Sequence, residues 1–301
     1  MNRVIRYIYL FIISSLSSQM YDSDFGTFSI YMNENIYVNK ELTKSIREMT
    51  EDLVNKFGEV DQDHFNVYIY DNNKQFQQSC SYIKGWEAGL AINKSPQTII
   101  IKGPQIQSYG ISQFIKVLEH ELSHIYLFRR ADGIRLPDWF EEGFAMHIAN
   151  EFTMNKKILI SESFWKGSTI EESQLKSFRN VSRSKIPLCY AQSAAFFRYI
   201  LSFKSVKEIL DSISLYNNFY RGLESVTQIK YSDIVLNLES SVLASYKWYI
   251  LIRFSKYIFY ITPFILVMGY IVTRRRNKKI LNTWELEELI DDTDWESHAE
   301  S

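Results

Sequence analysis

Apolar residues recur at three- and four-residue steps between Ile111 and Arg130, and this spacing predicts an amphipathic helix. The same pattern over residues 41–57, ended by Gly58, predicts another helix near the N-terminus. Alternating and β-branched runs predict strands at 65–70, 88–92 and 97–102, and a short helix is expected from Asp71 or Asn72 through Ser79. This order of elements favours an α+β domain.

The C-terminal half is predicted to be helical. Pro137 and Asp138 are favourable residues for the start of a helix. Further helices are expected from Pro187 through Phe203, after a capping box of Ser205 and Glu208, and from Ser232 or Asp233 towards Phe254. The segment 151–187 is polar and mixed, and its pattern predicts no secondary structure.

Two apolar stretches lie outside this pattern. Arg3 and Arg6 flank a short apolar run that ends in small residues, which predicts a signal peptide over 1–19; the alternative is an uncleaved anchor. The second stretch predicts a transmembrane helix at 254–273, with a buried core helix as the alternative. The uncharged part of this stretch is Tyr257–Thr273; five Lys and Arg residues follow it, and only Arg253 and Lys256 precede it closely. This excess predicts that the C-terminal side lies in the cytoplasm. Residues 20–250 would then form an extracytoplasmic domain on a single-pass cell-membrane protein.

The segment 274–301 is a predicted cytoplasmic tail, basic at first and then acidic. Its last part, 280–301, has eight acidic residues and no Lys or Arg. Interspersed Trp, Leu and Ile residues are compatible with a docking segment for a cytoplasmic partner, and the alternative is a solvated tail.

Charge and cysteine content narrow the function classes. A net charge of −1 argues against nucleic acid as a partner, because nothing in the composition requires a basic face. Cys80 and Cys189 are the only cysteines. Export would allow a disulfide between them, and two buried thiols are the alternative.

The strongest candidate for a functional site is the segment His120-Glu121-Leu122-Ser123-His124, which lies inside the helix predicted between Ile111 and Arg130. Positions i and i+4 share a helix face, so the two imidazoles project side by side and can supply half of a tetrahedral zinc site. Glu121 lies one step round the helix, where it can reach a metal-bound water without binding the metal. This is the position of a general base.

A third ligand is predicted in the segment Leu136-Pro-Asp-Trp-Phe-Glu-Glu-Gly-Phe-Ala145. Seventeen residues separate His124 from Glu142, and a helix, a turn and an antiparallel helix would return that carboxylate to the histidines. The chain here resembles the gluzincin metallopeptidases, and most closely their compact peptidase MA-like members. Their motif is His-Glu-x-x-His followed by Trp-x-x-Glu-Gly-x-Ala.

This resemblance implies a zincin-like domain: an N-terminal helix and small mixed sheet, a motif helix, a helix with the Glu ligand, and a helical C-terminal part. It implies Zn²⁺ held by His120, His124 and Glu142, with Glu121 as base. The choice of Glu142 over Glu141 rests on the Glu-Gly-x-Ala alignment. Many gluzincins have an acidic residue four positions after the Glu ligand, and Met146 stands there instead, so no carboxylate that orients a ligand histidine is evident.

The resemblance also implies substrate-binding and catalytic residues. Gly89-Leu90-Ala91 lie where such enzymes have an edge strand that pairs with extended peptide substrate; an interior hairpin is the alternative. Tyr190 is expected to donate a hydrogen bond to the oxyanion, or else to be a packing residue. The Gly-x-Met-Glu-Asn motif of aminopeptidases is absent, which favours an endopeptidase acting on peptides or unfolded proteins. The alternative is a non-catalytic membrane scaffold or binding module.

Overall fold

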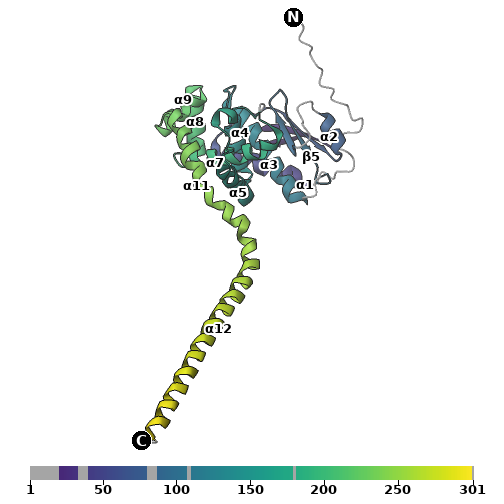
Figure 1. Cartoon of the computed structure of the whole chain (residues 1–301). Coiled ribbons are helices and arrows are strands. Elements are labelled where there is room, and N and C mark those ends of the chain that lie inside the picture. Colours follow the sequence, from purple (N-terminus) through teal and green to yellow (C-terminus); the bar gives the residue numbers. More distant parts are fainter. Residues whose placement is uncertain (1–19, 33–39, 80–86, 107–109, 179–180, 300–301) are drawn as a thin grey trace. The chain divides into compact units, whose positions relative to one another are not determined.

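The computed structural model describes residues 20–32, 40–79, 87–106, 110–178 and 181–299 (Figure 1). The predicted signal peptide and Cys80 lie outside these ranges, so cleavage and the pairing of Cys80 with Cys189 stay predictions. Two units divide between Lys247 and Trp248.

A five-stranded mixed sheet forms the N-terminal part of the first unit, in the order β1-β2-β3-β5-β4. The β2–β3 and β3–β5 pairs are parallel, and the two outer pairs are antiparallel. The strands are β1 (Met20–Ser23), β2 (Gly26–Met32), β3 (Phe65–Tyr70), β4 (Gly89–Ile92) and β5 (Gln97–Lys102). The predicted strands at 65–70, 88–92 and 97–102 are thus confirmed, and β4 is an edge strand within the described part of the chain.

The hairpin of β1 and β2 was not predicted from the sequence. β1 has only four residues, which are partly exposed, and the turn depends on Gly26 at φ +94. A Cβ on Gly26 would approach the Asp63 carbonyl oxygen to 2.7 Å, so the turn packs closely against another segment. Phe28 and Ile30 of β2 are buried in the core.

Helices cover the sheet and build the rest of the first unit. They are α1 (Lys40–Phe57), α2 (Asn73–Ser79), α3 (Gly110–Ala131), α4 (Asp138–Ile148), α5 (Met154–Trp165), α6 (Glu172–Leu175), α7 (Ile186–Ile200), α8 (Val206–Tyr216), α9 (Phe219–Thr227), α10 (Tyr231–Asn237) and α11 (Leu243–Ser245). Short 3₁₀ or π turns are η2 (Arg183–Lys185), η3 (Leu238–Val242) and η4 (Lys247–Tyr249), the last of which crosses the boundary between the units.

Most of the helix predictions agree with these bounds, and the capping box of Ser205 and Glu208 begins α8 as expected. The segment without an assignment contains α5 and α6. The helix expected from Ser232 towards Phe254 is instead broken into α10, η3 and α11, followed by a turn at Tyr246.

The motif helix α3 is anchored to the sheet through Arg129, near its C-terminal end. The guanidinium donates to the carbonyl oxygens of Phe25, Asp61 (2.9 Å) and Asp63 (3.1 Å), and to Gln97 Oε1 (2.6 Å). These partners belong to the β1–β2 turn, the segment before β3 and the start of β5. Because Arg129 is buried, these bonds fix the position of the helix relative to three parts of the sheet.

The second helix of the motif, α4, packs against α7 through an aromatic cluster that includes Phe140, Phe144 and Phe197. Gly143 makes this contact close. A Cβ there would lie 2.6 Å from Phe197 Cβ and 2.7 Å from the Ser193 carbonyl oxygen. α4 therefore packs against both α3 and α7 (Figure 1).

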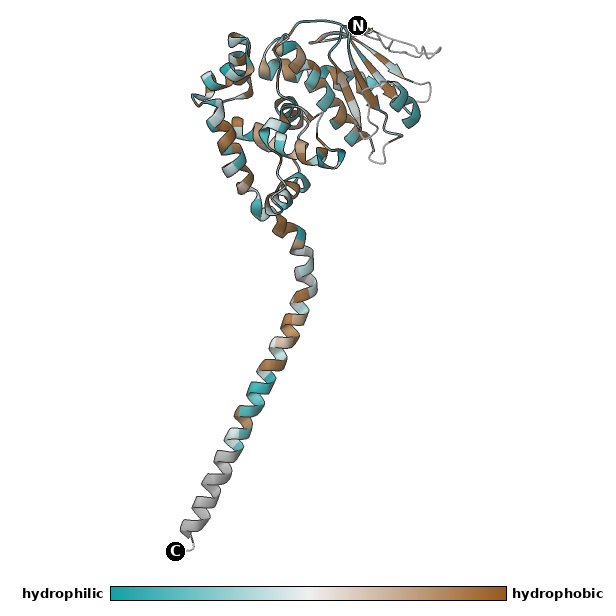
Figure 2. Cartoon of the chain, turned by 45° about the horizontal axis from the view of Figure 1, so that its top comes forward, coloured by the Kyte–Doolittle hydropathy of each residue, from teal (hydrophilic) through white to brown (hydrophobic). Residues whose placement is uncertain are grey.

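The second unit consists mainly of α12 (Ile250–Ala299), a helix with Pro263 inside it. Figure 2 shows apolar residues along part of α12, followed by a hydrophilic segment. Among the described residues, no single helix is long and apolar enough to span a membrane. Two helical segments joined at a bend, Tyr231–Ser255 and Tyr260–Glu285, are long and apolar enough only when they are taken together. The predicted span at 254–273 stays a prediction.

Candidate metal centre and adjoining cleft

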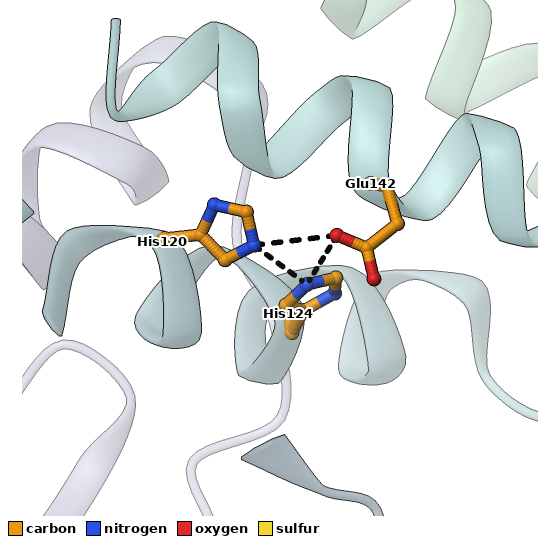
Figure 3. A group of neighbouring side chains, drawn as sticks. All are labelled: His120, His124 and Glu142. Atoms are coloured by element: carbon orange, nitrogen blue, oxygen red, sulfur yellow. Dashed lines mark hydrogen bonds and ion pairs between the residues drawn. The ribbon is translucent and has the colours of Figure 1, made fainter. Parts of the chain in front are cut away.

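Two histidines of α3 and one glutamate of α4 converge on one point (Figure 3). His120 and His124 lie one turn apart on the same face of α3, as the i, i+4 spacing predicts. Their Nε2 atoms are 3.3 Å apart. Glu142 Oε2 lies 3.3 Å from His120 Nε2 and 3.6 Å from His124 Nε2.

These distances match the edges of a tetrahedral metal site. Ligands about 2.05 Å from a zinc ion lie about 3.3 Å from one another when the geometry is tetrahedral. Glu142 Oε2 is also buried without a hydrogen-bond partner among the described residues. A buried carboxylate oxygen of this kind fits a cation, so the donor set and its spacing are compatible with a zinc ion.

The charges of the group also favour a shared cation. Burial raises the pKa of Glu142, but its contacts with the two histidines outweigh burial and hold the pKa at about 2. Burial lowers the pKa of His124, yet the contact with Glu142 raises it to about 9. The pKa of His120 is raised by the same balance. The low pKa of Glu142 favours an ionised carboxylate, which suits a divalent cation between this carboxylate and the two imidazoles.

Glu121 is buried beside this group, and burial raises its pKa. Its side chain lies against Gly89 at the start of β4. A Cβ on Gly89 would approach Glu121 Oε1 to 2.7 Å and Cγ to 2.9 Å. The absence of a side chain at position 89 thus makes room for the carboxylate.

The structure separates the two adjacent glutamates of α4. Glu142 belongs to the three-ligand group, and Glu141 does not. Burial, with the charges of Asp138 and Glu142 opposing His124, raises the pKa of Glu141 to about 7. Glu141 therefore differs from Glu142 both in position and in the pKa of its carboxyl group.

A cleft of about 580 Å³ adjoins the metal group. Its walls come from the start of β4, from α3, from the segment 151–159, and from η2 with the start of α7. The lining residues are Glu87, Ala88, Gly89, Val117, His120, Glu121, Glu151, Asn155, Lys156, Leu159, Arg183, Ile186, Pro187 and Tyr190. The walls combine apolar side chains with a few charged groups, which is typical of a ligand-binding cleft.

The structure brings Tyr190 and Gly89 into this cleft, together with His120 and Glu121. Tyr190 packs edge-on against Phe178, and burial followed by the charges of Glu142 and Glu121 raises its pKa well above the ordinary value. Leu90 and Ala91 belong to the edge strand β4 but are not part of the cleft wall.

Several cleft residues were not predicted, chiefly Glu151, Lys156 and Arg183. Glu151 Oε2 lies 3.6 Å from His120 Nδ1 and 3.3 Å from Lys156 Nζ. All three follow the motif in the segment for which the sequence pattern gave no assignment. Their polar character was visible there, but nothing in their spacing indicated a common wall.

A family model described as Peptidase MA superfamily matches residues 45–234, more than half of the chain. The matched region begins in α1 and ends in α10, so it includes α3, α4 and α7. No curated protein matches the chain.

Proposed function

The chain belongs to the Peptidase MA superfamily, and we propose that it is a zinc-dependent endopeptidase anchored in a membrane, with its peptidase domain outside the cytoplasm. The observation that carries the proposal is the arrangement of His120, His124 and Glu142 within 3.3–3.6 Å of one another, beside a buried glutamate and an open cleft. A protein that only binds peptides needs the cleft but not the converging ligands.

The proposed roles follow from position and charge. A zinc ion held by His120, His124 and Glu142 would acidify a water molecule and polarise a peptide carbonyl. Glu121 accepts the proton of the attacking water and passes it to the leaving amine. Burial supports this role, because a carboxylate with a raised pKa is a stronger base than a solvated one.

Two further features support peptide hydrolysis. The phenol of Tyr190 stays protonated, because its pKa is raised, and can donate a hydrogen bond to the developing oxyanion. Within the described residues β4 pairs only with β5, so its other edge can pair with an extended substrate backbone. Both features favour a peptide or an unfolded protein as substrate.

Membrane attachment is proposed from α12. Its apolar side chains are exposed, with Phe264, Ile265 and Leu266 each exposed by more than 60%. A continuous exposed apolar run of this kind is unfavourable in water. A lipid bilayer is the apolar environment that suits a run flanked by Lys and Arg. The excess of basic residues after the run supports a cytoplasmic C-terminus.

The function is tested with the purified full chain and two variants. We expect about one zinc per chain and cleavage of an unfolded protein that stops when a chelator is added. Glu121→Gln should keep the zinc and lose cleavage by a factor of about 10³ or more, whereas His124→Ala should lose the zinc.

Two results would contradict the proposal. If the chain bound no metal and was not stabilised by added zinc, His120, His124 and Glu142 would not form a metal centre. Retention of zinc by a chain that cleaves nothing would favour a non-catalytic scaffold. If Glu121→Gln cleaved at the wild-type rate, only the assignment of Glu121 as the general base would be wrong.

A further inference from the structure

We propose that Glu151 is the positioning residue for His120, orienting the imidazole so that Nε2 faces the metal. This inference rests on the proposed function, because it assigns a role within the same site. Glu151 was not among the residues predicted from the sequence. It lies outside the His-Glu-x-x-His and Glu-Gly-x-Ala motifs.

The first observation is the environment of the far nitrogen of His120. Nε2 faces His124 and Glu142, so in a neutral ligand imidazole the proton lies on Nδ1. His120 Nδ1 is buried and has no hydrogen-bond partner among the described residues. A buried N–H without an acceptor is costly, so this atom requires one.

Glu151 supplies an acceptor close to this nitrogen. Its Oε2 lies 3.6 Å from His120 Nδ1, slightly beyond hydrogen-bond length. A shift of about 0.7 Å brings the pair to an ordinary length of about 2.9 Å, and a glutamate side chain can make it by small rotations. A carboxylate on the far nitrogen fixes the tautomer and makes the ligand more basic.

The end of α4 places Glu151 there. Asn150 has φ +50, and the amide of Glu151 donates to the carbonyl oxygen of Met146 at 2.9 Å. This left-handed turn ends the helix and sends the chain back towards α3. One helix with its closing turn therefore carries both Glu142, on the near side of His120, and Glu151, on the far side.

Lys156 holds the Glu151 carboxylate in place. Its Nζ lies 3.3 Å from the same Oε2 atom that faces His120, and both side chains are mostly buried. Glu151 is thus held between a cation from α5 and the imidazole from α3. A carboxylate fixed from two sides has less freedom to lose when the imidazole binds a metal.

The assignment also accounts for Met146. That residue is fully buried and apolar, and it stands where gluzincins have their acidic orienting residue. In this chain the carboxylate comes from five residues further along, beyond the end of the helix. Glu151 would then orient the ligand histidine in place of an acidic residue at position 146.

The experiment measures the zinc dissociation constant of the full chain by competition with a chromophoric chelator. Glu151→Ala should weaken zinc binding about 10- to 100-fold. Glu151→Gln, which keeps an acceptor oxygen but no charge, should give a smaller loss. Lys156→Met should weaken binding less than Glu151→Ala. The matched control is Glu87→Gln, which removes one negative charge from the wall of the same cleft and should change the constant less than threefold.

A second readout separates positioning from folding. The visible spectrum of the Co²⁺-loaded protein reports ligand geometry, and it should change in Glu151→Gln but not in Glu87→Gln. If Glu151→Gln and Glu151→Ala lower only the melting temperature of the metal-free protein, with zinc affinity and spectrum unchanged, the inference is overturned. Equal losses of affinity in Glu151→Gln and Glu87→Gln would overturn it too, because the effect would be one of charge alone. If the wild-type chain binds no zinc, the proposed function itself fails.

Discussion

Glu121 and Gly89 face each other where α3 meets the edge strand β4. The space that the carboxylate occupies is the space that a Cβ at position 89 would fill. The buried position of the Glu121 carboxylate therefore requires a glycine at position 89. The strand itself would accept a larger residue, since Gly generally weakens a strand.

Gly89→Ala is expected to displace the Glu121 side chain. Because a displacement of about 1 Å can cost a factor of about 100, we expect kcat for peptide cleavage to fall about 10- to 100-fold with the zinc content unchanged. Gly269→Ala is the matched control, because a Cβ there meets nothing within 4 Å. Wild-type kcat in Gly89→Ala would show that Glu121 is not the base or that its position is not critical.

The protons of the metal group predict a pH dependence for the metal-free protein. The pKa of His124 is about 9 in the folded chain, above its ordinary value of 6.5. The folded state therefore keeps a proton that the unfolded chain has lost, so this stabilisation is complete below pH 6.5 and disappears as pH rises to 9. Glu142 has the opposite sign: with a pKa of about 2, its contribution is complete above pH 4.5 and disappears as pH falls towards 2.

Melting temperatures of the chelator-treated chain should accordingly fall between pH 6.5 and 9. With zinc bound, the histidines are neutral ligands, so the difference in melting temperature between loaded and metal-free protein should widen over the same range. His124→Ala should flatten the metal-free profile between pH 6.5 and 9. An equal slope in this variant would assign the effect to other groups.

At the residue scale, the geometry of the motif histidines could be predicted from the sequence, because the i, i+4 spacing on a helix determines which side chains share a face. His120, His124 and Glu142 do converge. Glu151 was not accessible. Its approach to His120 depends on the left-handed conformation of Asn150, and no spacing rule predicts which way a chain leaves a helix.

At the scale of elements, the close contact of α4 and α7 links the metal group to the cleft wall. Glu142 on α4 adjoins Gly143, and Tyr190 stands on α7, three residues before Ser193. Any change that separates these helices therefore moves Glu142 and Tyr190 relative to each other.

Gly143→Ala should therefore affect both stability and the site. A Cβ 2.6 Å from Phe197 Cβ forces the helices apart, and overpacking of this kind costs about 1–3 kcal/mol of unfolding free energy. We expect zinc affinity to fall as well. Gly222→Ala is the matched control: its Cβ would lie 2.5 Å from Ile213 Cα, between α8 and α9, which contribute no residue to the metal group or to the described wall of the cleft.

Urea denaturation and zinc competition on both variants separate the two effects. Both should be destabilised, and only Gly143→Ala should bind zinc more weakly. If the two variants lose stability but neither loses affinity, the α4–α7 contact has no special role in the site.

Elements with strong periodicity were predictable, and short or irregular ones were not. α3 has a long apolar face and α8 has a complete capping box, so their bounds follow from local sequence. β1 has four residues and no continuous apolar face. The breaks after α10 include a π turn, which depends on packing and not on propensity.

At the scale of the whole molecule, the two units have different surfaces. The first buries its apolar residues around the sheet and α3, whereas α12 exposes Phe264, Leu266 and Tyr270 by more than 60% each. The surface of the first unit can be solvated by water, because most of its large apolar side chains are buried. The second surface is the reason to expect that the full chain partitions into lipid.

Membrane association should therefore depend on α12 alone. We expect the full chain to sediment with membranes and to require detergent for extraction, whereas residues 20–247 should stay in the supernatant and bind zinc with the affinity of the full chain. Since Ser161 and Trp165 bond to the Lys247 carbonyl oxygen, the shortened chain ends after this contact.

A point variant tests the same prediction at full length. Leu266→Arg places a charge in the middle of the apolar run, which costs about 3 kcal/mol in a membrane-spanning helix. The variant should shift towards the soluble fraction, while an exposed substitution in the hydrophilic segment, Asn277→Arg, should not. Sedimentation of residues 20–247 with membranes would assign the association to the first unit, and extraction of the wild-type chain without detergent would exclude a membrane span. In either case the zinc affinity of residues 20–247 would still report on the peptidase domain, because the metal group and the described cleft wall lie entirely within the first unit.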